Sequence, residues 1–246
     1  NQQEQSIIIL HDISKIKEYE KIKKDLVANV SHELKTPLTA INGFAETALD
    51  ITKEKETKKY LEIIINNSKR LINIINDLLL LSNIENKDKN LEYEEVDLIK
   101  LLNNIQKIFE KRLKEKNLKF YLNLDKNNNK IFADLYMLEQ LFINLIDNAI
   151  KYTERGEIKI STYKKDENKL IIEVSDTGIG ISQEHIPKIF ERFYVADKSR
   201  SRETGGTGLG LSIVKHIVNL HNGEILVDSQ IGMGTKFIII LPVKNK

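Results

Sequence analysis

One histidine of the chain stands where its imidazole could receive a chemical group. Residues 31–38 read Ser-His-Glu-Leu-Lys-Thr-Pro-Leu within a helical pattern. When Val30 is placed at 0° and each residue advances by about 100°, Leu34 shares the apolar stripe of Val30, and His32 lies at roughly 200°, on the opposite face. An imidazole nitrogen exposed in this way can act as a nucleophile, and Glu33 could accept or orient the proton on the other nitrogen. Taken alone, the pattern also fits a solvated surface histidine.

Two asparagines four residues apart have the chemistry of a ligand pair for a metal ion and its phosphates. Asn144 and Asn148 share one face of a helix predicted at about 135–151. Amide carbonyl oxygens suit Mg²⁺, which keeps several water and phosphate oxygens around it. Lys151 could reach a phosphate oxygen and Tyr152 could line a nucleotide pocket. A pair of capping or surface asparagines is the alternative.

An aspartate ends an alternating strand predicted at 170–176. Because a carboxylate only accepts hydrogen bonds, Asp176 suits an exocyclic amine such as that of a nucleobase. Gly178 and Gly180 would let the backbone approach the base closely. A plain Asp-Gly turn is the simpler interpretation of this segment alone.

Four glycines, at positions 205, 206, 208 and 210, stand directly before a helix predicted at about 211–220. The amides of such a loop and the helix N-terminus form an anion site suited to a triphosphate. The glycine spacing does not match a dinucleotide fingerprint, and the Gly-Lys-Ser/Thr word of a P-loop is absent. Residues 181–204 are long and polar, which predicts a mobile lid. Three aromatic residues could dock this lid on a helical hairpin or pack in a core: Phe190, Phe193 and Tyr194.

Two long helices must position the histidine. Apolar residues recur every three or four positions from 15 to 88, except in a polar connection at 50–57. Two such helices cannot bury both apolar seams against each other. We therefore expect a dimerisation domain at residues 15–88, in which two copies form a four-helix bundle, and hence a homodimer.

The remaining residues, 92–246, mix strands and helices, which predicts an α/β sandwich with helices on one face of a mixed sheet. Asp97 and Asp134 are expected to cap two amphipathic helices, and Gly223 to end the helix that follows the glycines. Strands are predicted at 119–124, 131–133, 157–164, 170–176, 224–228 and 236–241. Residues 1–14 contain a short apolar run that we interpret as the remnant of an upstream sensor domain.

Composition narrows the classes of protein further. The 246 residues are 41% hydrophobic and 30% charged, with a net charge of +2 and no cysteine. Disulfides, thiolate metal sites and cysteine nucleophiles are excluded, and no strong attraction to nucleic acid or membrane is expected. No apolar run approaches the eighteen or so residues of a membrane span. Because the chain starts at Asn1, we interpret it as part of a longer protein.

Six segments in order resemble the sequence boxes of sensor histidine kinases from two-component systems. They are residues 31–38, 144–153, 176–180 (Asp-Thr-Gly-Ile-Gly), 190–194 (Phe-Glu-Arg-Phe-Tyr), 205–211 (Gly-Gly-Thr-Gly-Leu-Gly-Leu) and 234–237 (Gly-Thr-Lys-Phe). Short words occur by chance, but six in order over residues 15–243 are specific. Residues 197–202 and 211–216 are similar to the phosphate-sensing and cell-wall-sensing subgroup. Residues 12–14 resemble the end of a PAS sensor domain in that subgroup.

This resemblance implies a dimeric helical hairpin followed by an ATP-binding α/β sandwich of the gyrase, Hsp90 and histidine-kinase type. It implies that ATP phosphorylates His32 and that an aspartate on the receiver domain of a response regulator then takes the phosphoryl group. Thr36 would position water for dephosphorylating that partner. It also implies that this chain is the cytoplasmic portion of a membrane-anchored protein. This portion itself is expected to contact neither membrane nor nucleic acid.

The resemblance also assigns the nucleotide site. Asn148 is the principal Mg²⁺ ligand with Asn144 beside it, and Asp176 reads the adenine. The other implied ATP-binding residues are Lys151, Tyr152, Gly178, Gly180, Gly206, Thr207, Gly208, Leu209, Gly210 and Thr235. One position departs from the pattern: Val195 stands where many relatives carry an arginine near the terminal phosphate. Three residues could replace it: Lys198, Arg200 and Arg202.

Two other functions share parts of this pattern. An ATPase of the gyrase, Hsp90 or mismatch-repair type, or a protein serine kinase, would use the same sandwich but lacks the helix at 31–38 in front of it. A non-enzymatic dimeric relay is expected to lose Asn148, Asp176 or the glycines, and all of these are present.

Overall fold

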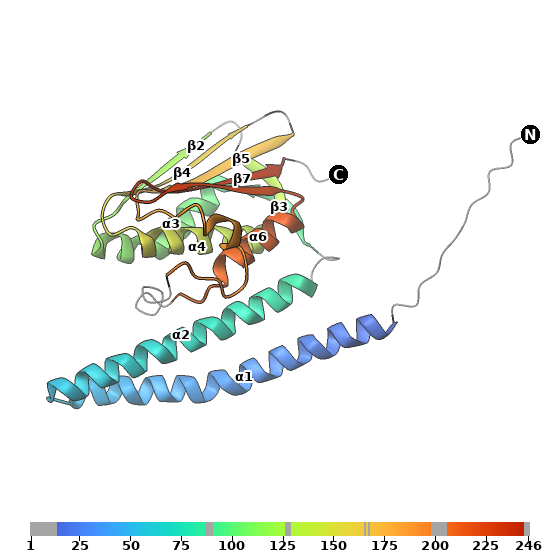
Figure 1. Cartoon of the computed structure of the whole chain (residues 1–246). Coiled ribbons are helices and arrows are strands. Elements are labelled where there is room, and N and C mark those ends of the chain that lie inside the picture. The colour runs from blue at the N-terminus through green and yellow to red at the C-terminus, as the bar shows by residue number, and fades with distance from the viewer. Residues whose placement is uncertain are drawn as a thin grey trace, which may run out of the picture.

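The computed structural model describes residues 14–86, 91–125, 129–164, 166, 168–197 and 206–243, with side chains from residue 27 onward except that of residue 86. It begins with a hairpin of two long helices, α1 (Ser14–Ile51) and α2 (Lys55–Asn86) (Figure 1). The turn between them, residues 52–54, is shorter than the predicted connection at 50–57. The strand expected within residues 1–14 lies outside the described residues.

The two helices meet along small side chains of α1, while α2 contributes the buried Ile65 and Ile75 as well as a serine. Ser31 and Ala45 of α1 and Ser68 of α2 are at most 6% exposed, so the helices pack closely at these positions. Val30 and Leu34, which were expected to lie in the buried stripe, are 47% and 48% exposed. Their burial was expected from a second copy of the hairpin and stays a prediction; within one hairpin, the neighbouring face that contains Ser31 packs on α2.

A stripe of large apolar side chains therefore stays exposed along the hairpin. It comprises Val30, Leu34, Ile41, Phe44 and Ile51 of α1 and Tyr60, Ile63, Ile64 and Leu71 of α2. We call this set the open stripe. A set of this size on one supersecondary unit is unusual for a surface that faces only water.

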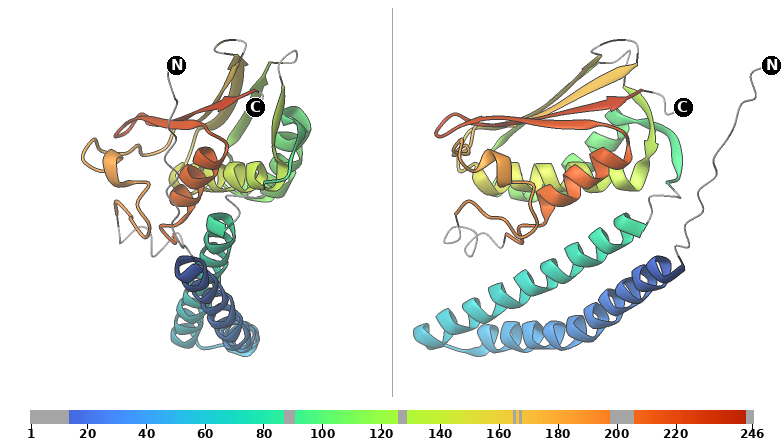
Figure 2. Two further views of the ribbon diagram at one scale, coloured as in Figure 1. Left: turned by 90° about the vertical axis from the view of Figure 1, so that its right-hand side faces the viewer. Right: turned by 45° about the vertical axis from the view of Figure 1, so that its right-hand side comes forward.

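The rest of the chain forms an α/β sandwich, as predicted. Five strands pair in the order β2-β4-β5-β7-β6, with β2 and β4 parallel and the other neighbours antiparallel. They are β2 (Lys119–Leu124), β4 (Glu157–Lys164), β5 (Lys169–Asp176), β6 (Glu224–Gln230) and β7 (Gly234–Pro242). Three helices cover one face of this sheet (Figures 1 and 2): α3 (Leu98–Glu115), α4 (Leu135–Tyr152) and α6 (Gly210–Leu220).

Two further strands form a small antiparallel sheet of their own, β1 (Tyr93–Asp97) with β3 (Lys130–Asp134). The sequence pattern predicts β3 but not β1. Val96 is the only buried side chain of β1, so the strand lacks the alternating pattern that would reveal it. A 3₁₀ turn, η1 (Ile186–Lys188), interrupts the predicted lid.

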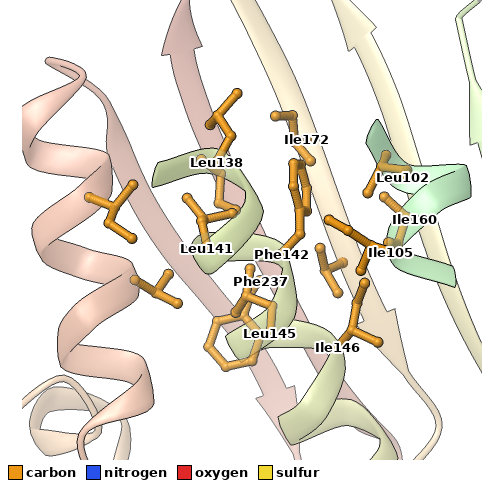
Figure 3. Packing of buried hydrophobic residues seen from close by; sticks show 14 of the residues in the cluster. Leu102, Ile105, Leu138, Leu141, Phe142, Leu145, Ile146, Ile160, Ile172 and Phe237 are labelled. Carbon is orange, nitrogen blue, oxygen red and sulfur yellow. The ribbon is translucent and has the colours of Figure 1, made fainter. Parts of the chain in front are cut away.

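The core of the sandwich lies between α4 and the sheet. Figure 3 shows side chains of α4 facing those of α3 and of the strands, all of them at most 5% exposed: Leu102, Ile105, Leu138, Leu141, Phe142, Leu145, Ile146, Ile160, Ile172 and Phe237. Burying each side chain of this size stabilises the fold by about 1.5–3 kcal/mol. Leu81 and Ile84, near the end of α2, belong to the same core, so the hairpin is anchored to the sandwich.

The predicted caps of α3 and α4 are confirmed. The side chain of Asp97 accepts the N–H groups of Ile99 and Lys100, and that of Asp134 accepts the N–H of Met137. None of the helices in the described part of the chain is long and apolar enough to cross a membrane.

Candidate functional site

The imidazole of His32 is exposed on α1, as predicted, and so is the carboxylate of Glu33. One turn later, the hydroxyl of Thr36 donates to the carbonyl of His32 at 3.4 Å. Pro37 lies inside α1 and has no N–H to donate to the carbonyl of Glu33. The ribbon of α1 bends part-way along its length (Figure 1). A partner molecule can therefore reach the imidazole of His32 on the exposed face of α1.

The asparagine face of α4 meets the start of α6. The side-chain amide of Asn144 donates from Nδ2 to the carbonyl of Gln140 at 2.8 Å, which fixes the orientation of its carbonyl oxygen. A Cβ placed on Gly210 would lie 2.7 Å from that oxygen. Asn148 lies one turn further along and is half-buried. The fold thus brings two predicted parts of the phosphate site together.

Between the two asparagines, Asp147 forms ion pairs in two directions. Its Oδ1 lies 2.6 Å from an Nη of Arg112 on α3, and its Oδ2 lies 2.6 Å from Nζ of Lys151. Burial alone would raise the pKa of Asp147, but Lys151 and Arg112 together hold that pKa below its ordinary value. Lys151, predicted to reach a phosphate, is therefore held on the asparagine face by an aspartate that the sequence analysis did not single out.

Asp176 lies at the end of β5, paired in register with Thr235 of β7. Its Oδ1 accepts the N–H of Gly178 at 2.8 Å. Burial raises the pKa of Asp176, and the hydrogen bond from Gly178 opposes that change. A hollow of about 320 Å³ beside this strand end is lined by Asp176 and Thr235, but its lining does not include Asn144, Asn148 or residues 206–210, so it is not the candidate nucleotide site as a whole. A partly desolvated acceptor of this kind can read an amine donor.

The loop before α6 is tied to the predicted lid. The backbone N–H of Phe193 donates to the carbonyl of Gly208 at 2.9 Å. The hydroxyl of Thr207 accepts the N–H of Leu209 at 3.2 Å, and the side chain of Leu209 is fully buried. Hydrogen bonds within the loop and to Phe193 therefore fix the conformation of its described part. Its backbone amides lie near the N-terminus of α6.

The aromatic residues of the lid segment fall into two groups. Phe190 and Tyr194 pack against the hydrophobic core, whereas Phe193 is 57% exposed. Core packing therefore accounts for two of the three, and that core includes residues of α2. The residues proposed to replace the arginine absent at Val195 lie outside the described part of the chain.

The helix α2 also contacts the sandwich through polar side chains that the sequence analysis missed. Asp77 accepts a hydrogen bond from Thr207, Arg70 donates to the carbonyl of Gly206, and Glu85 pairs with Arg192. Each contact joins residues more than 100 positions apart, and no local pattern marks such pairs. In Figure 1 and in the right view of Figure 2, α2 lies between α1 and the sandwich.

The candidate residues therefore form two groups. Asn144 and Gly210, and likewise Asp176 and Thr235, are brought together within the sandwich. His32 lies on α1, which α2 separates from the sandwich of the same chain (Figure 2).

Comparison with known families agrees with this division. Residues 22–87 match the family model of the His Kinase A (phospho-acceptor) domain, and residues 133–245 match that of the histidine kinase-, DNA gyrase B- and HSP90-like ATPase. The hairpin and sandwich are thus a phosphoacceptor module followed by an ATP-binding module.

Individual relatives carry both modules. The chain is 36% identical over 244 residues to the sensor histidine kinase WalK of Bacillus subtilis, an alignment that covers 98% of this chain and 40% of WalK. Histidine kinase AdeS of Acinetobacter baumannii is 30% identical, with a TM-score of 0.62 over 87% of this chain and 98% of that structure. The chain therefore belongs to the sensor histidine kinases of two-component systems, and it spans about two fifths of the length of WalK.

Two solved structures contain ligands or partners. Full-length ShkA in complex with AMPPNP has a TM-score of 0.70 at 26% identity and covers 90% of this chain and 46% of that one. Histidine kinase ThkA in complex with the response regulator TrrA has a TM-score of 0.63 at 31% identity and covers 94% and 65%.

Proposed function

We propose that this chain transfers the γ-phosphoryl group of ATP to His32. A nitrogen of the neutral imidazole attacks the γ-phosphorus in line, the bond from that phosphorus to the bridging oxygen breaks, and ADP leaves with the electron pair. Glu33 takes or orients the proton on the other ring nitrogen, which makes the attacking nitrogen more basic. The observation that carries the proposal is an exposed histidine on a helix joined to an ATP-binding sandwich.

The residues of the sandwich then have distinct roles toward ATP. Asp176 accepts from the adenine amine, the loop of residues 206–210 donates its amides to the phosphates, and Lys151 reaches a phosphate oxygen. Tyr152, Leu209 and Thr235 line the nucleotide.

The asparagine face fits Mg²⁺ because Gln140 holds the amide nitrogen of Asn144, which turns the carbonyl oxygen toward the start of α6. Asn148 would be the principal ligand, and the bound ion would neutralise charge on the phosphates.

The hairpin would form a homodimer through the open stripe. Nine large apolar side chains of one hairpin, each at least 42% exposed, would be covered by the same stripe of a second copy. A four-helix bundle is the arrangement that buries two such hairpins. The dimerisation and phosphotransfer domain would then span residues 15–88, and the catalytic domain residues 92–246.

The phosphohistidine would pass its phosphoryl group to an aspartate of a response regulator. Support comes from the ThkA structure, whose partner is a response regulator. Thr36 lies one turn from His32 on the same face and would orient water for the dephosphorylation of that regulator. We place the chain in the cytoplasmic portion of a longer, membrane-anchored sensor.

The test uses ATP labelled at the γ-phosphate, with and without Mg²⁺. We expect label on the protein that requires Mg²⁺, is lost in acid and survives alkali, as a phosphoramidate does. His32→Gln should abolish this label while AMPPNP still binds. Asn29→Gln, an exposed polar position on the same helix, is the matched control and should label fully.

Other results would favour the alternative functions. Acid-stable label would indicate a serine or threonine kinase, and ATP turnover without labelled protein would indicate an ATPase. Full labelling of the His32→Gln variant would contradict the phosphoacceptor assignment.

A further inference from the structure

The helix α2 reaches the loop that is proposed to hold the nucleotide phosphates. Oδ2 of Asp77 accepts a hydrogen bond from the hydroxyl of Thr207 at 2.7 Å. Arg70, seven residues earlier, donates from Nε to the carbonyl of Gly206 at 3.3 Å. Seven residues are about two helical turns, so both side chains extend from one face of α2 to two adjacent residues of the loop.

Asp77 is also electrostatically coupled to the asparagine face of α4. Burial raises the pKa of Asp77, the hydrogen bond from Thr207 and the charge of Lys151 lower it, and the charge of Asp147 raises it. The carboxylate is therefore partly desolvated and lies within the field of Lys151. Both Thr207 and Lys151 belong to the predicted ATP-binding set.

One donor cannot serve two anions. The hydroxyl of Thr207 has a single proton to donate, and in this structure Asp77 accepts it. A phosphate oxygen bound at Thr207 would need the same proton and the same attraction from Lys151. It would also stand beside a second negative charge, which raises the free energy of a partly buried site.

We propose that the carboxylate of Asp77 holds the place of a nucleotide phosphate oxygen while α2 is docked, so that docking at this point and binding of the phosphates of ATP oppose each other. The inference rests on the proposed function in that Thr207 and Lys151 are taken to serve those phosphates. The two effects are reciprocal: the factor by which docking of α2 lowers the affinity for ATP equals the factor by which bound ATP lowers the equilibrium constant for docking.

The opposition has a structural outcome. Leu81 and Ile84 belong to the core of the sandwich, and Leu78 and Leu80 pack against it, so a separation at Asp77 would also shift the packing of this part of α2 on the sandwich. In the docked arrangement α2 stands between α1 and the sandwich of the same chain (Figures 1 and 2). ATP binding would thus loosen the contact that keeps the phosphate loop on α2 and away from His32.

The test is calorimetric titration of the full chain with AMPPNP and Mg²⁺, and separately with adenosine, which has no phosphate. Asp77→Asn should bind AMPPNP at least roughly five-fold tighter, the lower end of typical coupling between sites, with unchanged affinity for adenosine. Asp77→Ala should do the same, which excludes a substitute hydrogen bond from the asparagine. Glu62→Gln removes a charge from an exposed position of the same helix and should match the wild type.

A second variant tests the interface without touching the carboxylate. Arg70→Ala removes the other contact to the loop, and we expect a smaller tightening for AMPPNP and none for adenosine. Thermal unfolding followed by circular dichroism identifies variants that remain folded.

Two results would overturn the inference: AMPPNP affinity that is unchanged or weaker in the Asp77 and Arg70 variants, or equal tightening for adenosine. If the wild type binds neither AMPPNP nor adenosine, the proposed function itself fails, and this inference fails with it.

Discussion

The backbones of Gly208 and Phe193 lie against each other. The N–H of Phe193 donates to the carbonyl of Gly208 at 2.9 Å, and a Cβ on Gly208 would stand 2.8 Å from the Cα and carbonyl carbon of Phe193. Both residues have positive φ, 74° and 61°. This contact joins the middle of the predicted lid to the phosphate loop, so the shape of one depends on the other.

Replacing Gly208 by alanine should therefore destabilise the sandwich twice over. The left-handed conformation costs alanine about 1 kcal/mol, and the clash with Phe193 adds roughly 2 kcal/mol. Gly232→Ala is the matched control, because its φ is 79° but nothing lies within 4 Å of its Cβ position. We expect urea unfolding to show a loss of about 3 kcal/mol for Gly208→Ala and about 1 kcal/mol for Gly232→Ala. Equal losses would mean that the Phe193 contact is unimportant.

Arg112→Ala should lower the free energy of unfolding by about 1 kcal/mol, because it leaves Asp147 with Lys151 as its remaining ion-pair partner and the pair is partly exposed. Lys111→Ala is the control, since its side chain is 87% exposed and lies 3.9 Å from Glu115. That variant should stay within about 0.5 kcal/mol of the wild type. The comparison is made by chemical denaturation, and a silent Arg112→Ala would contradict a structural role for the ion pair.

Acid should weaken the fold through His221. Its Nδ1–H donates to the carbonyl of Ile217 at 2.8 Å and its Nε2 accepts the N–H of Asp134 at 3.1 Å, which requires the neutral ring. Burial lowers the pKa of His221. The hydrogen bond to the carbonyl of Ile217 and the negative charge of Asp134 act in the opposite direction but do not cancel this effect. The unfolded chain then binds this proton more readily, so stability is full above the unfolded pKa of about 6.5 and falls as pH drops below it.

The check is urea unfolding at several pH values. His221→Gln should flatten the loss of stability below about pH 6.5, at the cost of lower stability throughout. His32→Gln replaces an exposed imidazole and should keep the wild-type slope. An unchanged slope in the His221 variant would assign the acid sensitivity to other groups.

Phe44→Asp should convert the dimer to a monomer. Phe44 is 78% exposed in the open stripe, and a carboxylate there would be desolvated in a bundle core. Thr39→Asp places the same charge at an exposed position roughly 140° around α1 from Phe44, away from the stripe, and should remain dimeric. Sedimentation velocity distinguishes the two states. A wild type that sediments as a monomer at all concentrations would refute the proposed homodimer.

Asn148→Ala should weaken binding of AMPPNP at least ten-fold when Mg²⁺ is present, because the proposed metal ligand is lost. In excess EDTA the variant and the wild type should bind AMPPNP alike, and adenosine should not distinguish them. Titration calorimetry measures all three conditions. A defect of equal size in EDTA would show that Asn148 contacts the nucleotide rather than the metal.

Local physics made most of the fold predictable. Apolar residues at period two gave β4 and β5, and the side chains of Asp97 and Asp134 marked the starts of α3 and α4. The strand β1 was missed because it is stabilised by pairing with β3, more than thirty residues away, and only Val96 is buried. Its last residue, Asp97, was assigned only to the start of α3.

The candidate site was predictable as a list of residues but not as a set of contacts. Asn144, Asn148 and Asp176 could be named because their spacing and position carry chemistry. Asp77 could not, since one aspartate on a helix surface is ordinary until Thr207 is found beside it. Periodicity located the apolar stripe of α1 but not the face that packs within the hairpin, which contains Ser31 and Ala45.

Pro37 divides α1 into two lengths that need not turn together. The part before it, residues 14–36, is roughly 35 Å long at 1.5 Å per residue, and it carries His32 near its C-terminal end. A change of about 10° at Pro37 would move the far end of this arm by roughly 6 Å, close to the pitch of one helical turn. The proline therefore makes α1 a lever, in which a large displacement at one end becomes a small, graded reorientation beside the histidine.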